Sequence, residues 1–205
     1  MHQIRSENQK IDHVVFASGS GGTAAGITLG LALTYLENND TDNVPNIHAV
    51  GVCDDPDYFY NTISNITKEM GLEDVASVLE SSSLSSSLMT TTGDNISIET
   101  FIRHYLTVHQ GKGKGYSVST TEELDFIVDF AVETGICLDP VYSGKALFRF
   151  MEEIKQNPES YKNSRVLFWH TGGSLGNYEK IDALRSKLRL ISSVERMDVY
   201  KGKEK

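Results

Sequence analysis

The stretch IDHVVFASGSGGT, residues 11–23, decides the fold of this chain. Its first part, residues 11–17, is short, apolar and rich in β-branched side chains, which is typical of a buried β-strand. The turn that follows holds three glycines within five residues: Gly19, Ser20, Gly21, Gly22 and Thr23. Residues 24–39 are apolar with few charges, and we expect them to form a helix. This order predicts a βα unit whose turn approaches a ligand closely.

Strands and helices alternate along the rest of the chain. We expect two more buried strands, at residues 46–53 and 164–170. The expected helices span residues 56–70, 95–109, 120–133, 146–155 and 177–188. Near-continuous apolar strands between helices predict an α/β fold, with a mostly parallel sheet covered by helices on both faces.

The domain organisation follows from local composition. Residues 1–190 are expected to form one large domain, interrupted at residues 77–94 by a flexible insertion rich in serine and threonine. Residues 191–205 carry alternating charges, which is typical of a solvated tail.

Composition excludes several classes of protein. The formal net charge of −9 argues against a nucleic-acid partner, and no apolar stretch is long enough to serve as a membrane span or signal peptide. Cys53 and Cys137 have apolar neighbours and no CxxC spacing, so we expect buried free thiols in a reducing compartment. The cytoplasm is the expected location, and no metal site is expected.

The glycine-rich turn favours a phosphate ligand, because its backbone N–H groups and the helix dipole together attract an anion. No GK[ST] follows, which excludes a nucleoside-triphosphate loop, and the spacing of a nucleophile elbow is absent. Gly19, Gly21 and Ala24 fit part of a dinucleotide fingerprint, but no acid lies at the expected place after the second strand. A nicotinamide-dependent oxidoreductase therefore stays open, as does a turn without a ligand.

Four segments in order carry a family resemblance: SGSGGT (18–23), GKGYSVST (113–120), LDPVYSGKA (138–146) and LFWHTGGSLG (167–176). Over residues 11–188 the chain resembles the D-cysteine desulfhydrase and 1-aminocyclopropane-1-carboxylate (ACC) deaminase family. Members of this family are pyridoxal 5′-phosphate (PLP) enzymes of fold type II. The resemblance implies the large domain of such an enzyme, in its C-terminal portion only, with the N-terminal part missing.

The resemblance implies roles for individual residues. Gly19, Ser20, Gly21, Gly22 and Thr23 would hold the cofactor phosphate. Tyr116 and Tyr142 would be catalytic and face the substrate, where a positioned phenol binds a carboxylate or moves a proton. Ser143 and Thr171 would contact the cofactor ring, and His170 would brace the end of its strand.

A lysine that binds the cofactor covalently is expected upstream of the phosphate loop in this family. Only ten residues precede the first expected strand here, and neither Lys10 nor Lys145 has the required sequence context. We therefore expect a partial subunit that lacks this link and is inactive on its own. A non-catalytic homologue is the alternative.

The substrate expectation rests on two positions. Ser143 and Thr171 resemble the desulfhydrase branch, in which neutral hydroxyls replace a carboxylate near the pyridine nitrogen. The resemblance implies D-cysteine as the substrate, with ACC as the alternative and a homodimer as the possible assembly.

Overall fold

A four-stranded, wholly parallel sheet forms the centre of the protein. The computed structural model describes residues 10–37, 40, 43–72 and 97–191. The strands are β1 (His13–Ser18), β2 (Asn46–Gly51), β3 (Leu106–Gln110) and β4 (Val166–Phe168), in the order β3-β2-β1-β4. All three strand pairs are parallel. The predicted α/β class is confirmed.

Strand β3 differs from the sequence prediction, which gave one helix over residues 95–109. Helix α6 (Ile98–Tyr105) ends at Tyr105, and the chain continues directly as β3. Leu106 and Val108 are buried while Thr107 is exposed, which is the alternation of a strand. Pairing with β2, from Ile47 opposite Leu106 to Gly51 opposite Gln110, overrides the helical spacing.

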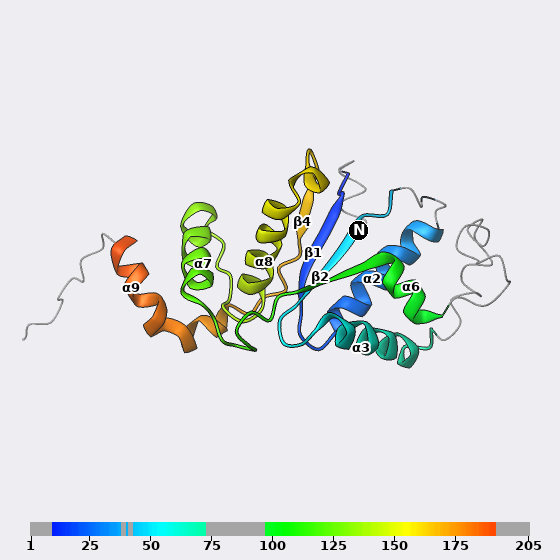
Figure 1. Cartoon of the computed structure of the whole chain (residues 1–205), viewed down its shortest axis with the longest axis horizontal. Helices are drawn as coiled ribbons and strands as arrows, with labels where there is room; N and C mark the ends of the chain where they lie inside the picture. Colours follow the sequence, from blue (N-terminus) through cyan, green and yellow to red (C-terminus); the bar gives the residue numbers. More distant parts are fainter. Residues whose placement is uncertain (1–9, 38–39, 41–42, 73–96, 192–205) are drawn as a thin grey trace, which may run out of the picture.

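Helices cover both faces of the sheet, as predicted. Val14 and Phe16 of β1 pack with α2 (Gly22–Glu37), α3 (Pro56–Glu69) and α6 in one core. Val15 and Ala17 point to the opposite face and pack with α8 (Ser143–Gln156). Figure 1 shows α2, α3 and α6 on one side of the sheet and α8 on the other.

An outer layer lies beyond α8. Helix α7 (Thr121–Thr134) begins with a capping box between Thr120 and Glu123 and ends at Gly135, whose φ is 74°. It packs against α8 and against α9 (Ile181–Ile191) (Figure 1). The predicted last helix at residues 177–188 is partly wrong, because the short 3₁₀ segment η3 (Ser174–Lys180) precedes α9.

Other predictions have mixed outcomes. Strand β4 is an edge strand among the described residues rather than a buried one, and Val166 is 38% exposed. Cys53 is partly buried, but Cys137 is exposed, contrary to expectation. Within the described ranges no helix is long and apolar enough to span a bilayer. The expected insertion at 77–94 and, apart from Ile191, the expected tail at 191–205 lie outside the described residues.

The order in which the chain adds strands to the sheet reverses beside β1. The chain moves outward from β1 to β2 and β3, and β4 then joins the other side of β1. In open parallel sheets, ligands bind at such a switch point, outside the carboxyl ends of the strands. The turn after β1 and the loop after β4 therefore leave the same edge of the sheet.

Three histidines form a chain of hydrogen bonds across the sheet. His13 Nδ1 lies 3.0 Å from His48 Nε2, and His48 Nδ1 lies 2.9 Å from His109 Nε2. Their rings come from β1, β2 and β3 and pack with Phe150 of α8 and with Tyr161, the last residue of η2 (Pro158–Tyr161). Burial, with smaller contributions from the other two rings, lowers the pKa of His48 to about 3. Burial also lowers the pKa of His13 and of His109.

This histidine chain makes stability depend on pH. Below about pH 6.5 the unfolded chain takes up protons that the folded chain does not, so the free energy of unfolding falls as the pH falls. We expect His48→Gln to remove up to about 1.4 kcal/mol per pH unit from the slope between about pH 5 and pH 6.5. Urea unfolding at several pH values between about pH 5 and pH 6.5 measures this slope. An unchanged slope in His48→Gln would contradict the expectation.

Candidate active site

The turn after β1 and the loop after β4 meet around one cavity. Its volume is about 320 Å³. Eight residues line it: Ala17, Gly19, Ser20, Thr23, Tyr142, Thr171, Gly172 and Gly173. Three of the four predicted motifs thus come together at the carboxyl edge of the sheet, although they lie up to about 150 residues apart in the chain.

The glycine-rich turn gives α2 an open beginning. Helix α2 starts at Gly22 and has no acidic residue in its first turn. The N–H groups of a first helical turn have no acceptor within the helix, and the helix dipole makes this end positive. Ser20, Gly22 and Thr23 are exposed at this point. The backbone N–H groups here can therefore bind an anion.

Two glycines make this turn possible. Gly21 has a φ of 85°, and its Cα faces Thr62 and Ile63 of α3. A side chain at Gly19 would place its Cβ 2.8 Å from Cε1 of Tyr142. Cys53 also supports the turn, because its thiol donates to the Gly19 carbonyl at 3.3 Å. Gly21 and Gly22 do not line the cavity, so among the described residues they shape the turn while Gly19, Ser20 and Thr23 face the cavity.

Tyr116 and Tyr142 are paired through their hydroxyls. The two oxygens lie 2.6 Å apart, and the rings are nearly perpendicular, at 69°. Tyr142 lines the cavity, whereas Tyr116 is 52% exposed and reaches the site through Tyr142. The hydrogen bond with Tyr116, with burial second, raises the pKa of Tyr142 to about 12. Tyr142 is therefore protonated at neutral pH and has a proton to donate.

Asp139 fixes the turn that carries Tyr142. Its carboxylate is buried and accepts from the backbone N–H groups of Val141 at 2.9 Å, Tyr142 at 2.7 Å and Ser143 at 2.7 Å. It also accepts from the Ser143 hydroxyl at 2.6 Å. The turn leads directly into α8, so this carboxylate sets the direction in which Tyr142 leaves the backbone.

Ser143 is hydrogen-bonded within the turn itself. Its hydroxyl donates to the Asp139 carboxylate and accepts from the Asp139 N–H at 2.9 Å. The residue is buried and does not line the cavity. The expected contact between Ser143 and the cofactor ring stays a prediction.

The loop after β4 is held open by glycines and braced by His170. Gly172 and Gly173 have φ values of 102° and 101°, which favour glycine. The His170 ring accepts from the Gly172 N–H at 3.0 Å through Nδ1, and its Nε2 donates to the Cys137 carbonyl at 3.1 Å. The predicted bracing role of His170 is confirmed. Thr171 lines the cavity, as its predicted role requires.

Sequence reasoning missed Asp139 and the two glycines of this loop. A Cβ on Gly173 would lie 2.9 Å from Oδ1 of Asp139, so the loop and the Tyr142 turn are in close contact. Both features stood in the quoted motifs, in DPVY and in HTGG. An aspartate four residues before the first residue of a helix is a recognisable turn signal, but the sequence does not reveal which loop packs on it.

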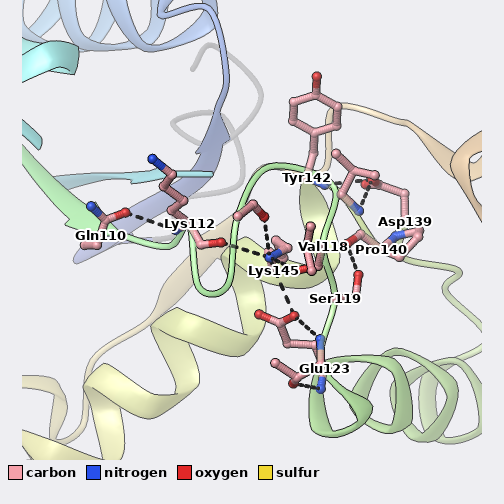
Figure 2. A network of polar contacts seen from close by, with 12 residues as sticks. Gln110, Lys112, Val118, Ser119, Glu123, Asp139, Pro140, Tyr142 and Lys145 are labelled. Carbon is pink, nitrogen blue, oxygen red and sulfur yellow. Dashed lines mark hydrogen bonds and ion pairs between the residues drawn. The ribbon is translucent and has the colours of Figure 1, made fainter. Parts of the chain in front are cut away.

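Neither candidate lysine is free to bind a ligand in the cavity. Lys10 precedes β1, whereas the cavity lies beyond the other end of that strand, roughly 20 Å away. Lys145 is buried, and its ammonium donates to three backbone carbonyls (Figure 2). Among the described residues the cavity lining holds no lysine.

Replacing Asp139 with asparagine should loosen the Tyr142 turn. One acceptor oxygen becomes an NH₂ group, so at least one hydrogen bond to a charged acceptor is lost. We expect the free energy of unfolding to fall by about 2–4 kcal/mol, measured by urea denaturation. Asp182→Asn is the matched control, because the Asp182 side chain is 89% exposed, and its effect should stay within about 0.5 kcal/mol. Equal stability of the two variants would show that Asp139 does not hold the turn.

Comparison with known proteins identifies relatives of this arrangement. Residues 1–172 match the family model described as "Pyridoxal-phosphate dependent enzyme". The bifunctional D-cysteine desulfhydrase/1-aminocyclopropane-1-carboxylate deaminase of Arabidopsis thaliana, named as mitochondrial, is 37% identical over 95% of the chain. A D-cysteine desulfhydrase of Salmonella schwarzengrund is 28% identical over 80% of it.

A solved structure shares the fold. The crystal structure of an ACC deaminase homologue superposes with a TM-score of 0.60 and 25% identity over 90% of this chain. The chain spans 40% of the length of each of the two curated relatives and 47% of the solved chain. Taken with the glycine-rich turn and the loops that meet at the sheet edge, the matched residues establish that the chain belongs to the pyridoxal-phosphate dependent enzyme family.

Proposed function

We propose that this chain is the cofactor-phosphate-binding portion of a PLP-dependent lyase whose whole form converts D-cysteine to pyruvate, ammonia and sulfide. The observation that carries the proposal is the convergence of the glycine-rich turn, Tyr142 and the Thr171 loop on one cavity at the switch point of a parallel sheet. Membership of a PLP family replaces the nicotinamide alternative.

The residues around the cavity fit the phosphate end of PLP. Among the described residues the lining contains no carboxylate to repel an anion, and the first turn of α2 offers backbone N–H groups. Thr23 and Ser20 add hydroxyls on the same turn. Ser18, at the end of β1, has a buried hydroxyl without a partner among the described residues, and a polar group bound at that point would supply one. These features support a phosphate site.

The remaining residues suit a small amino-acid substrate. PLP, when bound, supplies an electron sink for reactions at the substrate α-carbon. Thr171 would offer a neutral hydrogen bond to the ring side. Tyr142, which is protonated at neutral pH and hydrogen-bonded to Tyr116, would hold a substrate carboxylate or donate a proton.

Of the two positions behind the choice between D-cysteine and ACC, Thr171 lines the cavity, while the hydroxyl of Ser143 donates to Asp139. A neutral hydroxyl beside the pyridine ring gives a weaker electron sink than a carboxylate would. Expelling a β-thiolate needs less assistance than opening a cyclopropane ring, which favours D-cysteine. The net reaction consumes one water and releases pyruvate, ammonia and hydrogen sulfide. ACC deamination is the second candidate, because the name of the Arabidopsis relative carries both activities.

The proposed setting is the cytoplasm, where the two free thiols would stay reduced. A homodimer is the proposed assembly. Both follow from the family resemblance and from cysteine usage.

Binding of PLP to this chain should quench its single tryptophan. Trp169 lines a separate hollow beside Gly26 and Gly30 of α2, but it lies only two residues before Thr171 of the cavity, so bound PLP would be within energy-transfer distance of the indole. We expect saturable quenching by PLP, no quenching by NAD, and about tenfold weaker PLP binding in Thr23→Val. Thr107→Val on the exposed side of β3 is the matched control and should bind as the parent does. Borohydride should leave no cofactor label on Lys10 or Lys145. Equal quenching by NAD, or no effect of Thr23→Val, would contradict the phosphate site.

Substrate choice can be measured in a full-length protein that contains this sequence. We expect sulfide release from D-cysteine to exceed 2-oxobutanoate release from ACC, compared as kcat/KM. Replacing the threonine at the Thr171 position with leucine removes the hydroxyl, and this change should reduce the preference for D-cysteine over ACC. A higher kcat/KM for ACC in the parent would assign the chain to the deaminase branch.

A further inference from the structure

A buried lysine lies in the middle of the glycine-rich loop that carries Tyr116. Lys145 is 1% exposed and is the third residue of α8. Its ammonium donates to the carbonyls of Lys112 at 3.0 Å, Gly115 at 3.2 Å and Val118 at 2.7 Å. Figure 2 shows the loop wrapped around the end of this side chain.

The three carbonyls belong to the first and last residues of two consecutive turns, 112–115 and 115–118. The Gly115 N–H donates to the Lys112 carbonyl at 3.1 Å, and the Val118 N–H donates to the Gly115 carbonyl at 3.2 Å. Tyr116 lies inside the second turn. Lys145 therefore holds the first carbonyl of each turn and the last carbonyl of the second.

The loop needs such an anchor because its backbone is intrinsically unfavourable. Gly113 and Gly115 have φ values of 58° and 147°, and Ser117, a residue with a side chain, has a φ of 58°. Glycines lose much conformational freedom on ordering, and a left-handed serine is strained. Without tethers, a segment of this kind samples many conformations.

Glu123 completes the anchor. Its carboxylate lies 3.6 Å from the Lys145 ammonium, and it also accepts from the Thr120 N–H at 2.7 Å as part of the capping box of α7. The buried positive charge is thus balanced, and the loop is joined to the beginnings of α7 and α8 (Figure 2).

We propose that Lys145 is a positioning residue whose buried ammonium orders the loop at residues 112–118 and thereby brings the Tyr116 hydroxyl to Tyr142. The inference deepens the proposed function, in which the tyrosine pair faces the substrate. Tyr142 lies three residues before Lys145, so one helix start controls both tyrosines: the Asp139 turn directs Tyr142, and Lys145 holds the loop of Tyr116.

Hydrogen–deuterium exchange of the whole chain tests the first step and requires no cofactor. Lys145→Met keeps the aliphatic length but removes the three charged hydrogen bonds. We expect amides of residues 112–118 to exchange about tenfold faster or more, while β1 and β2 keep their protection. Lys155→Met is the matched control, because Lys155 is on the same helix, exposed, and paired only with Glu152 in the described structure. Parent-like exchange of residues 112–118 in Lys145→Met would overturn the proposal.

Adding small ammonium ions to a Lys145→Ala variant separates the contribution of the ammonium hydrogen bonds from that of side-chain packing. Lys145→Ala leaves space for 1-propylammonium, which should restore slow exchange of the loop, whereas tetramethylammonium at equal ionic strength has no N–H to donate and should not. If Lys145→Met also speeds hydrogen exchange in β1 and β2, the Glu123→Gln variant is used as the test of the proposal. It keeps an acceptor for Thr120 and removes only the balancing charge. Faster exchange confined to residues 112–118 in that variant supports the proposal, and general or unchanged exchange overturns it.

The link to Tyr116 is tested by a double-mutant cycle. Tyr116→Phe removes the 2.6 Å hydrogen bond and should lower the folding equilibrium constant about fivefold in the parent and in Lys155→Met. In Lys145→Met the loop is already released, so the same change should cost less than about twofold. Equal costs in all three backgrounds would show that Lys145 does not act through Tyr116. Because neither measurement involves PLP, a failure of the proposed function would appear only in the cofactor and substrate experiments.

Discussion

The buried carboxylate of Asp139 is the interaction on which the site depends. An unpaired charge in the interior is costly, and this one is tolerated because four donors surround it within a single turn. The same turn ends the chain segment after α7 and begins α8. It directs Tyr142 toward Gly19, and its acid packs against Gly173 of the loop after β4. One side chain therefore sets the distance between the two halves of the cavity.

Much of the fold was predictable because its signals are local. β1 and β2 are short, mostly apolar and almost wholly buried. Asp55 and Pro56 mark the start of α3, and Thr120 with Glu123 marks the start of α7. The glycine-rich turn between β1 and α2 was equally clear, because three glycines in five residues between a buried strand and a helix mark a sharp change of chain direction. These features are decided within about ten residues of chain, and no partner is needed to recognise them.

The errors arose where distant contacts decide. Phe101, Ile102, Tyr105 and Leu106 continue a helical spacing, and only pairing with β2 turns the chain into β3 at Leu106. The hydrogen bond from Ser143 to Asp139 was not foreseen, because a motif names residues without giving the direction of their side chains. Lys145 was set aside as an unsuitable partner for the cofactor. Its contacts with carbonyls 27–33 residues away could be recognised only after the loop and α8 had been brought together.

The pairing of β1 with β4 has a consequence for how the protein is made. Arg165, just before β4, donates its N–H to the Asp12 carboxylate across 153 residues of sequence. A nascent chain leaving the ribosome therefore presents β1, β2 and β3 long before β4 is synthesised. Until then one edge of β1 has unpaired N–H and C=O groups beside apolar side chains, which is a template for association with another chain. Of the described strands β4 is made last, and it both covers that edge and brings the Thr171 loop to the cavity, so protection from aggregation and assembly of the cavity occur in the same step.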